Sequence, residues 1–168
     1  MKLALKFIAF AFLTIAPLST YAQSNVAHIN VQQLISEMPE VIAAQNELAK
    51  LEKDYTTQID NAFKEFQTKA QSYSADAANQ TDVTNQARQK ERESMQTNLQ
   101  EFRDSAAQEL QKKQMDLMTP LLEKARNAIT KVGQEQGFDY VIDASPNGGI
   151  ILADGKDLIE DVKRELGF

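Results

Sequence analysis

Residues 40–119 read EVIAAQNELAKLEKDYTTQIDNAFKEFQTKAQSYSADAANQTDVTNQARQKERESMQTNLQEFRDSAAQELQKKQMDLMT, without a single glycine or proline. All six glycines of the chain lie after Val132. Turns depend heavily on these two residue types, whereas alanine, glutamine, glutamate and lysine, which are abundant here, favour helix. The stretch therefore predicts long helices, around which we expect the rest of the chain to be organised.

The apolar residues of this stretch recur every three or four positions, so they occupy one narrow stripe, and polar residues fill the other faces as in a coiled coil. Short polar residues at 74–82 interrupt the stripe and predict a chain reversal. We therefore expect a helical hairpin, the arm, over residues 39–132 with its tip near 74–82. The stripe continues past Pro120, which favours a kink there over a helix end. Gly133 and Gly137 are expected to close the second helix.

Runs rich in β-branched and aromatic residues flank the arm on both sides. Residues 26–31 form the first predicted strand, residues 138–143 the second and residues 149–153 the third. The turn residues at 145–148 predict that the second and third strands form a β-hairpin.

Two short helices are expected beside these strands. Asn30 can cap the first, which precedes Pro39. Asp157 can cap the last, with Glu160 at the matching capping-box position. The fold class is thus α+β and predominantly helical, with a small strand-bearing body formed by residues 23–38 and 133–168.

This body is too small to bury a large core, and its few strands leave an exposed sheet edge. Association of several copies through the strands would cover both. The apolar strand residues expected to mediate this homo-oligomerisation are Val26, Ile29, Tyr140, Val141, Ile142, Ile150 and Ile151.

The N-terminus has the pattern of a secretory signal peptide, residues 1–22. Lys2 and Lys6 come before an apolar run over 7–15. Small residues lead up to Ala22, and we expect cleavage after it. The apolar run is short for a membrane span, although a retained anchor helix is the alternative. The chain has no cysteine, so neither disulfides nor a lipid-modified cysteine are available.

Removal of the leader lowers the 18 basic residues to 16 against 24 acidic residues, so the formal charge changes from −6 to −8. Such a chain should be poorly attracted to nucleic acid or to an anionic membrane surface.

The sequence offers no catalytic constellation, nucleotide-binding loop or cofactor motif, so we expect neither an enzyme nor a bound cofactor. His28 is the only histidine and is interpreted as a strand side chain. The carboxylates that follow the strands do not have calcium-loop spacing, so no metal site is expected; they are Asp139, Asp143, Asp154 and Asp157.

Three segments resemble the Skp/OmpH family of periplasmic chaperones: residues 28–40, HINVQQLISEMPE; residues 120–143, from Pro120-Leu121 to Gly137-Phe138-Asp139-Tyr140-Val141-Ile142-Asp143; and the closing Lys156-Asp157-Leu158 helix. The likeness extends over the chain that follows the leader, and its most specific part is the second segment.

The resemblance implies a periplasmic homotrimer in which strands of three subunits form a central barrel and three arms enclose a cavity. It also implies that the chain holds unfolded outer-membrane β-barrel proteins there without ATP. The arm residues that could contact such clients are Tyr55, Phe63, Phe66, Tyr73, Met95 and Phe102. The best-known members have basic arms, whereas residues 61–95 carry five basic and five acidic groups here. We therefore expect no strong membrane or lipopolysaccharide binding.

Two functions fit these observations. The first is an ATP-independent periplasmic holdase chaperone for unfolded outer-membrane proteins. The second is a structural coiled-coil spacer or tether in the cell envelope, in which the aromatic residues of the arm only pair the two helices.

Overall fold

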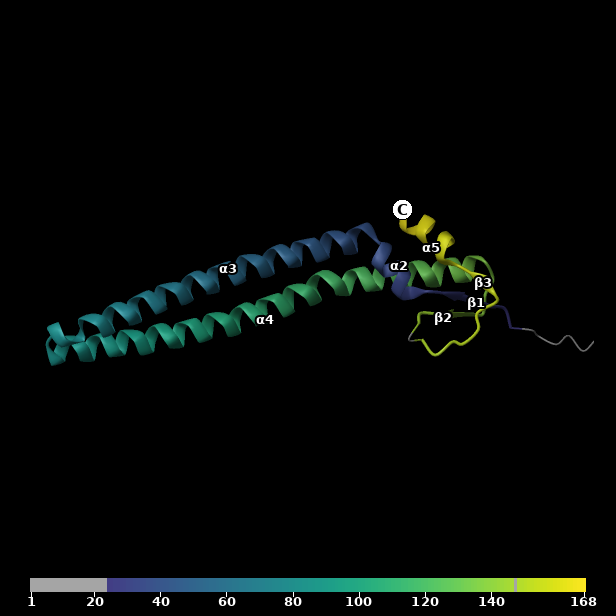
Figure 1. Ribbon diagram of the computed structural model, residues 1–168. Coiled ribbons are helices and arrows are strands. Elements are labelled where there is room, and N and C mark those ends of the chain that lie inside the picture. Colours follow the sequence, from purple (N-terminus) through teal and green to yellow (C-terminus); the bar gives the residue numbers. More distant parts are fainter. Residues whose placement is uncertain (1–23, 147) are drawn as a thin grey trace, which may run out of the picture.

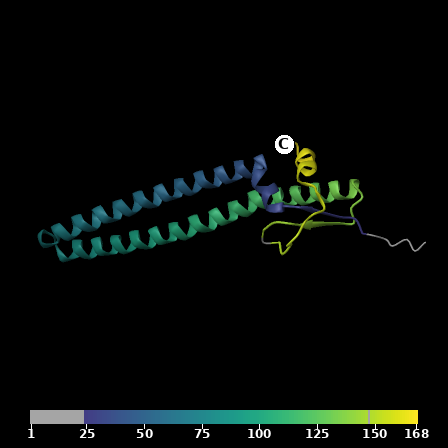
Figure 2. The same cartoon turned by 45° about the vertical axis from the view of Figure 1, so that its right-hand side comes forward.

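The computed structural model describes residues 24–146 and 148–168 as a long helical hairpin attached to a small body (Figures 1 and 2). The predicted signal peptide lies outside the described residues. In chain order the elements are β1 (Val26–Ile29), α2 (Val31–Glu37), α3 (Pro39–Asp76), a 3-10 turn (Ala77–Asn79), α4 (Asp82–Glu135), β2 (Tyr140–Asp143), β3 (Lys156–Asp157) and α5 (Ile159–Leu166). No helix in the described ranges combines the length and apolar character needed to cross a membrane.

The arm consists of α3, with 38 residues, and α4, with 54. Pro39 occupies the first turn of α3, where its missing N–H is not needed, and Glu40 follows it at the positive end of the helix dipole. α4 passes through Pro120 without a break, so the alternative of a helix end there is excluded. Gly133, expected to close α4, instead lies inside it, and the helix ends at Glu135 before Gly137 with its positive φ of 74°.

The two arm helices meet along a seam of half-buried and buried side chains. Its successive members on both helices are three, four and four residues apart, which is a repeat of 11 residues and not of seven. Because such a repeat gives about 3.67 residues per turn, it favours nearly straight helices with a slight right-handed twist. On α3 the seam comprises Leu48, Leu51, Tyr55, Ile59, Ala62, Phe66, Ala70 and Tyr73, and on α4 it comprises Arg88, Glu91, Met95, Leu99, Phe102, Ala106, Leu110, Lys113, Leu117 and Leu121.

The sheet has the order β2-β1-β3, and both neighbours run parallel to the central strand β1. In register, Val26 pairs with Tyr140 and Ile29 with Asp143, while His28 pairs with Asp157. The sequence correctly located β1 and β2 at opposite ends of the chain.

The predicted β-hairpin is wrong. The turn exists, since the Gly148 N–H donates to the Ser145 carbonyl over 2.7 Å, but residues 149–153 form no strand. β2 and β3 lie on either side of β1 and both run parallel to it. After β2 the chain must therefore return along the sheet before it enters β3, and a tight turn cannot join two strands that run in the same direction. The residues from Ala144 to Gly155 are used for this return.

The core lies where the sheet meets α2, α5 and the root of the arm, by which we mean the N-terminal end of α3 and the C-terminal end of α4. Gly133 allows β2 to approach α4 closely, because a Cβ at this position would lie 2.7 Å from Val141 Cγ2. The buried residues of this cluster are Ala27, Ile29, Leu34, Met38, Val41, Ala125, Ala128, Val132, Leu158 and Val162.

Ion pairs and hydrogen bonds hold α5 against the other helices of the body. Lys163 Nζ lies 2.6 Å from Glu37 Oε2 on α2, and Lys131 Nζ lies 2.6 Å from Glu165 Oε1. Asp161 accepts from the Gln136 amide, and this bond, with the neighbouring Lys156, lowers the pKa of Asp161 to about 2.

The N-terminal cap of α5 differs from the expected capping box. Asp157 lies in β3 and its Oδ1 accepts from the Ile159 N–H, whereas Leu158 is the residue at the cap position. Glu160 pairs with Lys163 instead of reaching back. Asn30 does cap α2 as predicted, since its Oδ1 accepts from the Gln33 N–H over 2.9 Å.

Candidate functional site

The arm contains all six side chains considered for client contact, and the structure divides them into two groups. Five are half-buried on the seam, where the Tyr55 and Phe102 rings meet edge to face with centroids 6.2 Å apart. Phe63 is different, because it remains 38% exposed beside the seam, with the Arg103 guanidinium 6.0 Å from its ring centroid. The five seam residues are Tyr55, Phe66, Tyr73, Met95 and Phe102.

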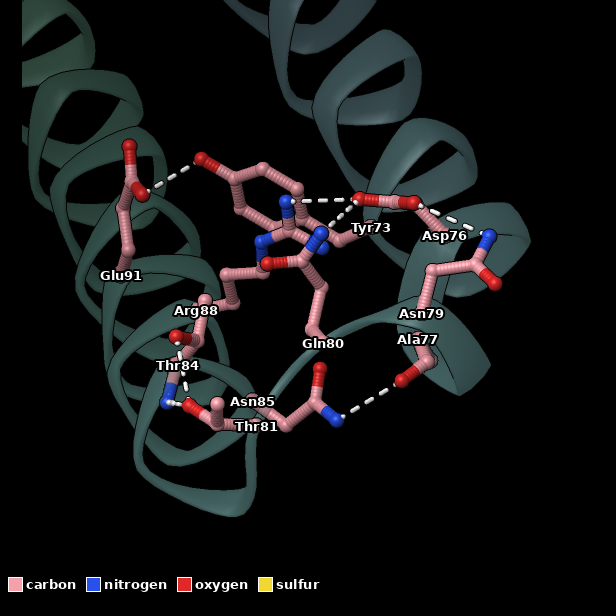
Figure 3. Close-up of polar contacts among 10 residues, drawn as sticks. All are labelled: Tyr73, Asp76, Ala77, Asn79, Gln80, Thr81, Thr84, Asn85, Arg88 and Glu91. Carbon is pink, nitrogen blue, oxygen red and sulfur yellow. Dashed lines mark hydrogen bonds and ion pairs between the residues drawn. The ribbon is translucent and has the colours of Figure 1, made fainter.

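Near the tip the side chains between the two helices are mostly polar, and Figure 3 shows their contacts around Tyr73, Arg88 and Glu91. Tyr73 donates to Glu91 Oε2 over 2.6 Å, and Lys69 Nζ donates to Glu91 Oε1 over 2.8 Å. Arg88 donates to Asp76 over 3.1 Å, and its guanidinium carbon lies 4.8 Å from the centroid of the Tyr73 ring. The distal seam therefore joins the helices mainly through charged and aromatic groups, whereas most of the other seam positions are apolar.

The reversal itself is closed by short-range hydrogen bonds. The Thr81 hydroxyl accepts from the Thr84 N–H over 3.2 Å and so caps α4, and the Asn85 amide donates to the Ala77 carbonyl over 2.9 Å. The Asn79 and Gln80 side chains both donate to Asp76. These hydrogen bonds explain why the short polar residues of 74–82 correctly predicted a turn.

Glu91 and Lys113 occupy seam positions that the apolar stripe did not reveal. Each falls where that stripe has a gap, and each forms a cross-helix ion pair: Glu91 with Lys69, and Lys113 Nζ with Glu47 Oε1 at 2.7 Å. Extending the 11-residue repeat through the gaps would have identified both positions.

We expect closure of the tip to depend on pH. The hydrogen bond from Lys69, followed by that from Tyr73, holds the pKa of Glu91 below its usual range, and the hydrogen bond from Arg88 does the same for Asp76. Both carboxylates therefore stabilise the folded tip above their unfolded pKa values, about 4, and this contribution disappears as the pH falls through their lowered folded values. Hydrogen-exchange protection factors near the tip should decrease there before those around Leu99.

A pair of variants isolates the Glu91 contacts. Glu91→Gln should lower protection at the tip already at neutral pH, because it removes the charge that faces Lys69. Glu93→Gln changes the same charge at an exposed position whose described partner is Gln89 on the same helix, so protection should persist. Equal protection in the two variants, or no loss in acid, would contradict this assignment.

The body presents a second group of candidate residues, those expected to mediate association. Tyr140 is 60% exposed on β2, Ile151 is fully exposed in the connection to β3, and Val26, Ile142 and Ile150 are also exposed. Val141 is half-buried against α4, and Ile29 is buried in the chain's own core. β2 and β3 are the outer strands of the sheet, so each has one side unpaired among the residues that the structure describes.

A polar cluster around the buried Ser145 fixes the end of β2 to the start of α2. The Ser145 hydroxyl accepts from the Gln32 N–H and donates to Asp143 Oδ1, which also accepts from the Val31 N–H over 3.3 Å. Burial opposes ionisation of Asp143, but the hydrogen bonds from Ser145 and Val31 outweigh it and lower the pKa of this carboxyl. Sequence patterns gave no signal for this cluster, because its members are about 113 residues apart.

Three of the four carboxylates considered for metal binding accept hydrogen bonds from backbone N–H groups instead, and the fourth, Asp154, is exposed. Asp139 accepts from the Asn25 N–H, Asp143 belongs to the cluster above, and Asp157 accepts from the Ile159 N–H. Within residues 24–146 and 148–168, no three histidine or acidic side chains are grouped to hold a metal ion. His28 is half-buried on β1.

Comparison with known proteins gives consistent matches. The sequence profile of the family described as "Outer membrane protein (OmpH-like)" matches residues 25–166. The chain is 26% identical over 160 residues to the chaperone protein Skp of Yersinia enterocolitica, covering 92% of this chain and 93% of that protein. It is 23% identical over 155 residues to Skp of Pectobacterium atrosepticum, with 90% of each covered. These relatives are chaperones and not enzymes, as the sequence predicted.

The fold is similar to that of a candidate outer membrane chaperone (OmpH-like) from Caulobacter crescentus, solved by crystallography. The TM-score is 0.77 with 12% identity, over 86% of this chain and 85% of that one. At this identity the likeness shows a shared fold: a predominantly helical α+β architecture with a long hairpin.

Proposed function

Because the chain belongs to the family of OmpH-like outer membrane proteins, which includes the Skp chaperones, we propose that it is an ATP-independent periplasmic holdase. Its clients are unfolded outer-membrane β-barrel proteins, which it binds after export and keeps from aggregating. The predicted signal peptide supports the periplasmic location.

The observation that carries this proposal is the distribution of exposed apolar side chains along the arm. Ile42 and Leu122 lie near the root, Met115 and Phe63 farther out, and Val83 at the tip, where it is 77% exposed. Each isolated side chain offers a weak contact. Several such contacts along one arm, and more on neighbouring arms, would hold a long client by multivalency without imposing a conformation on it.

We also propose that three copies associate through the body, with the arms projecting from a shared sheet. The support is physical: β2 and β3 each leave one side unpaired among the described residues, and exposed Tyr140, Ile142 and Ile151 lie on or beside them. An unpaired, apolar strand edge favours pairing with another chain. Lipid and lipopolysaccharide are not proposed as partners, because the mature chain is acidic and the distal arm neutral.

The holdase proposal is tested by diluting a urea-denatured β-barrel outer-membrane protein into buffer and following light scattering. With the mature protein present in several-fold molar excess and no ATP, scattering should fall well below that of the client alone. An unrelated acidic helical protein at equal mass serves as the control. Unchanged aggregation in the presence of the mature protein would refute the proposal.

The alternative function, a spacer or tether, is favoured by the position of five of the six candidate residues on the seam. Hydrogen exchange distinguishes the two functions. Client addition should raise protection along the arm of a chaperone, whereas the arm of a spacer should be unaffected.

A further inference from the structure

The seam divides the arm into two flanks with different chemistry. One flank, the charged flank, comprises the residues that immediately precede seam positions, and side chains on it join the two helices. Its Glu47 and Glu109 contact the seam residues Lys113 and Tyr55 of the opposite helix, with Tyr55 donating to Glu109, and Glu40 pairs with Lys124 nearer the body. A groove on this flank is lined mainly by charged residues: Glu47, Lys50, Asp54, Glu109, Lys112 and Asp116.

The opposite flank, the glutamine flank, comprises the residues that immediately follow seam positions. Along α4 these include Gln89, Gln100 and Gln111, spaced by the 11-residue repeat, and Gln96 and Gln114 lie beside them. From position 89 to position 114 the α4 residues of this flank include two arginines but no acidic residue. Among the described residues, no ion pair crosses between α3 and α4 on this flank.

A groove of about 510 Å³ on the glutamine flank lies between the same stretches of α3 and α4 as the charged groove. The two grooves share no lining residue, so they open on opposite faces of the arm. Glu52 is the only charged residue of the glutamine-flank groove, whose other lining residues are Gln45, Leu48, Ala49, Ala107, Leu110, Gln111 and Gln114.

Further grooves lie along the same flank in both directions. Toward the body, Gln45 also lines a hollow with Val31 and Ile35, and these two residues in turn line a groove of about 560 Å³, which contains Leu122. Toward the tip, Gln89 and Gln96 line another groove. The contact between Phe63 and Arg103 lies between that groove and the glutamine-flank groove. The 22 steps from position 89 to position 111 span about 33 Å of helix, the length of about ten residues of extended chain.

We propose that the glutamine flank is the surface along which the arm holds an extended polypeptide of low net charge. This inference rests on the proposed holdase function and specifies the face and the kind of segment bound. A glutamine amide both donates and accepts, so it can satisfy the unpaired N–H and C=O groups of any extended backbone. Ile42, Phe63 and Leu122 lie on the same flank and supply apolar contacts.

The charged flank is unsuited to the same partner. Its carboxylates and ammonium groups already pair with one another, as Glu47 does with Lys113. An apolar segment laid over them would remove charges from water without offering compensating hydrogen bonds, which is unfavourable.

Crosslinking tests whether the glutamine flank binds the client. Because the chain has no cysteine, one introduced cysteine carries the reactive label at a chosen position. Cysteine is introduced in the mature protein at Gln96, Gln111 or Gln114 on the glutamine flank. The matched positions are Ser94, Asn98 and Ser105, which are equally exposed on the charged flank of the same helix. Each variant receives a benzophenone maleimide and is irradiated with a urea-denatured β-barrel outer-membrane protein that has just been diluted.

We expect several-fold more crosslinked client from the glutamine flank than from the charged flank. The combined Gln96→Glu, Gln111→Glu and Gln114→Glu variant should also suppress aggregation less well than wild type. The matched Ser94→Glu, Asn98→Glu and Ser105→Glu variant adds the same three charges on the opposite flank and should retain suppression.

The outcomes separate this inference from the function on which it rests. Equal or reversed crosslinking, with suppression of aggregation intact in wild type, would overturn the flank assignment and leave the holdase function standing. No suppression by wild type and no crosslink from any position would overturn both.

Discussion

A chain carrying Ile151→Asp should be a folded single subunit at concentrations where the wild type is a trimer. Ile151 is fully exposed and lies in the connection between β2 and β3, so the substitution removes no contact within the chain. If the residue is covered by a second copy, an unpaired carboxylate at that interface costs about 3–5 kcal/mol. Each affected interface would then weaken by more than about a hundredfold.

The measurement is the mass from light scattering, combined with the far-ultraviolet circular dichroism of the same sample. Val83→Asp provides the matched control, because it makes the same kind of change at an exposed apolar residue at the arm tip. It should leave the trimer intact. A trimeric mass for the Ile151→Asp variant would show that this segment lies outside the interface. A single-subunit mass for wild type would refute the proposed trimer itself.

Ile151 is a sharper choice than Ile142, although both were predicted from the sequence to mediate association. Ile142 is a partly exposed member of β2, where it pairs with His28. A charge there would disturb the sheet of the single chain as well as any contact with a neighbour. Dissociation and unfolding could not then be told apart.

The helical hairpin was predictable because its determinants are local. The absence of glycine and proline from 40–119, the apolar stripe and the short polar residues at the tip all act within a few turns of helix. The strands β1 and β2 were predictable for the same reason. Their pairing followed once the hairpin returned the chain to its starting point.

The sheet topology was not predictable in this way, because strand direction depends on partners remote in sequence. β3 consists only of Lys156 and Asp157, residues with low strand propensity, and it joins the sheet beside the fully buried Leu158. The apolar residues 149–153 had the stronger strand pattern, but they lie in the connection that parallel strands require.

The candidate site was only partly predictable from composition. Aromatic residues on the arm were easily found, but whether each lies on the seam or on a flank depends on the phase of the 11-residue repeat. Phe63 and Phe66 are three residues apart, yet the first is exposed and the second belongs to the seam. The contrast between the two flanks is likewise visible only once the seam has been located.

A second variant, Leu34→Ala, should strongly destabilise the body. Leu34 is 0% exposed and lies in the core shared by the sheet, α5 and the roots of the arm. Its helix, α2, has only seven residues, too few to persist without tertiary packing. Truncating a buried leucine removes transfer free energy and leaves a cavity, which together lower the free energy of unfolding by about 2–5 kcal/mol.

Urea titration at a fixed protein concentration measures the effect, because association contributes to the apparent stability. Leu122→Ala is the control, since that leucine is 44% exposed on α4 and makes the same change in a helix. Alanine is the best helix former, so a loss confined to Leu34→Ala must come from packing and not from helix propensity. The distal seam shares no residue with this core, so we expect the arm of the variant to remain partly helical after its body unfolds. Equal losses in the two variants would show that Leu34 contributes no more to the stability of the body than an exposed leucine does.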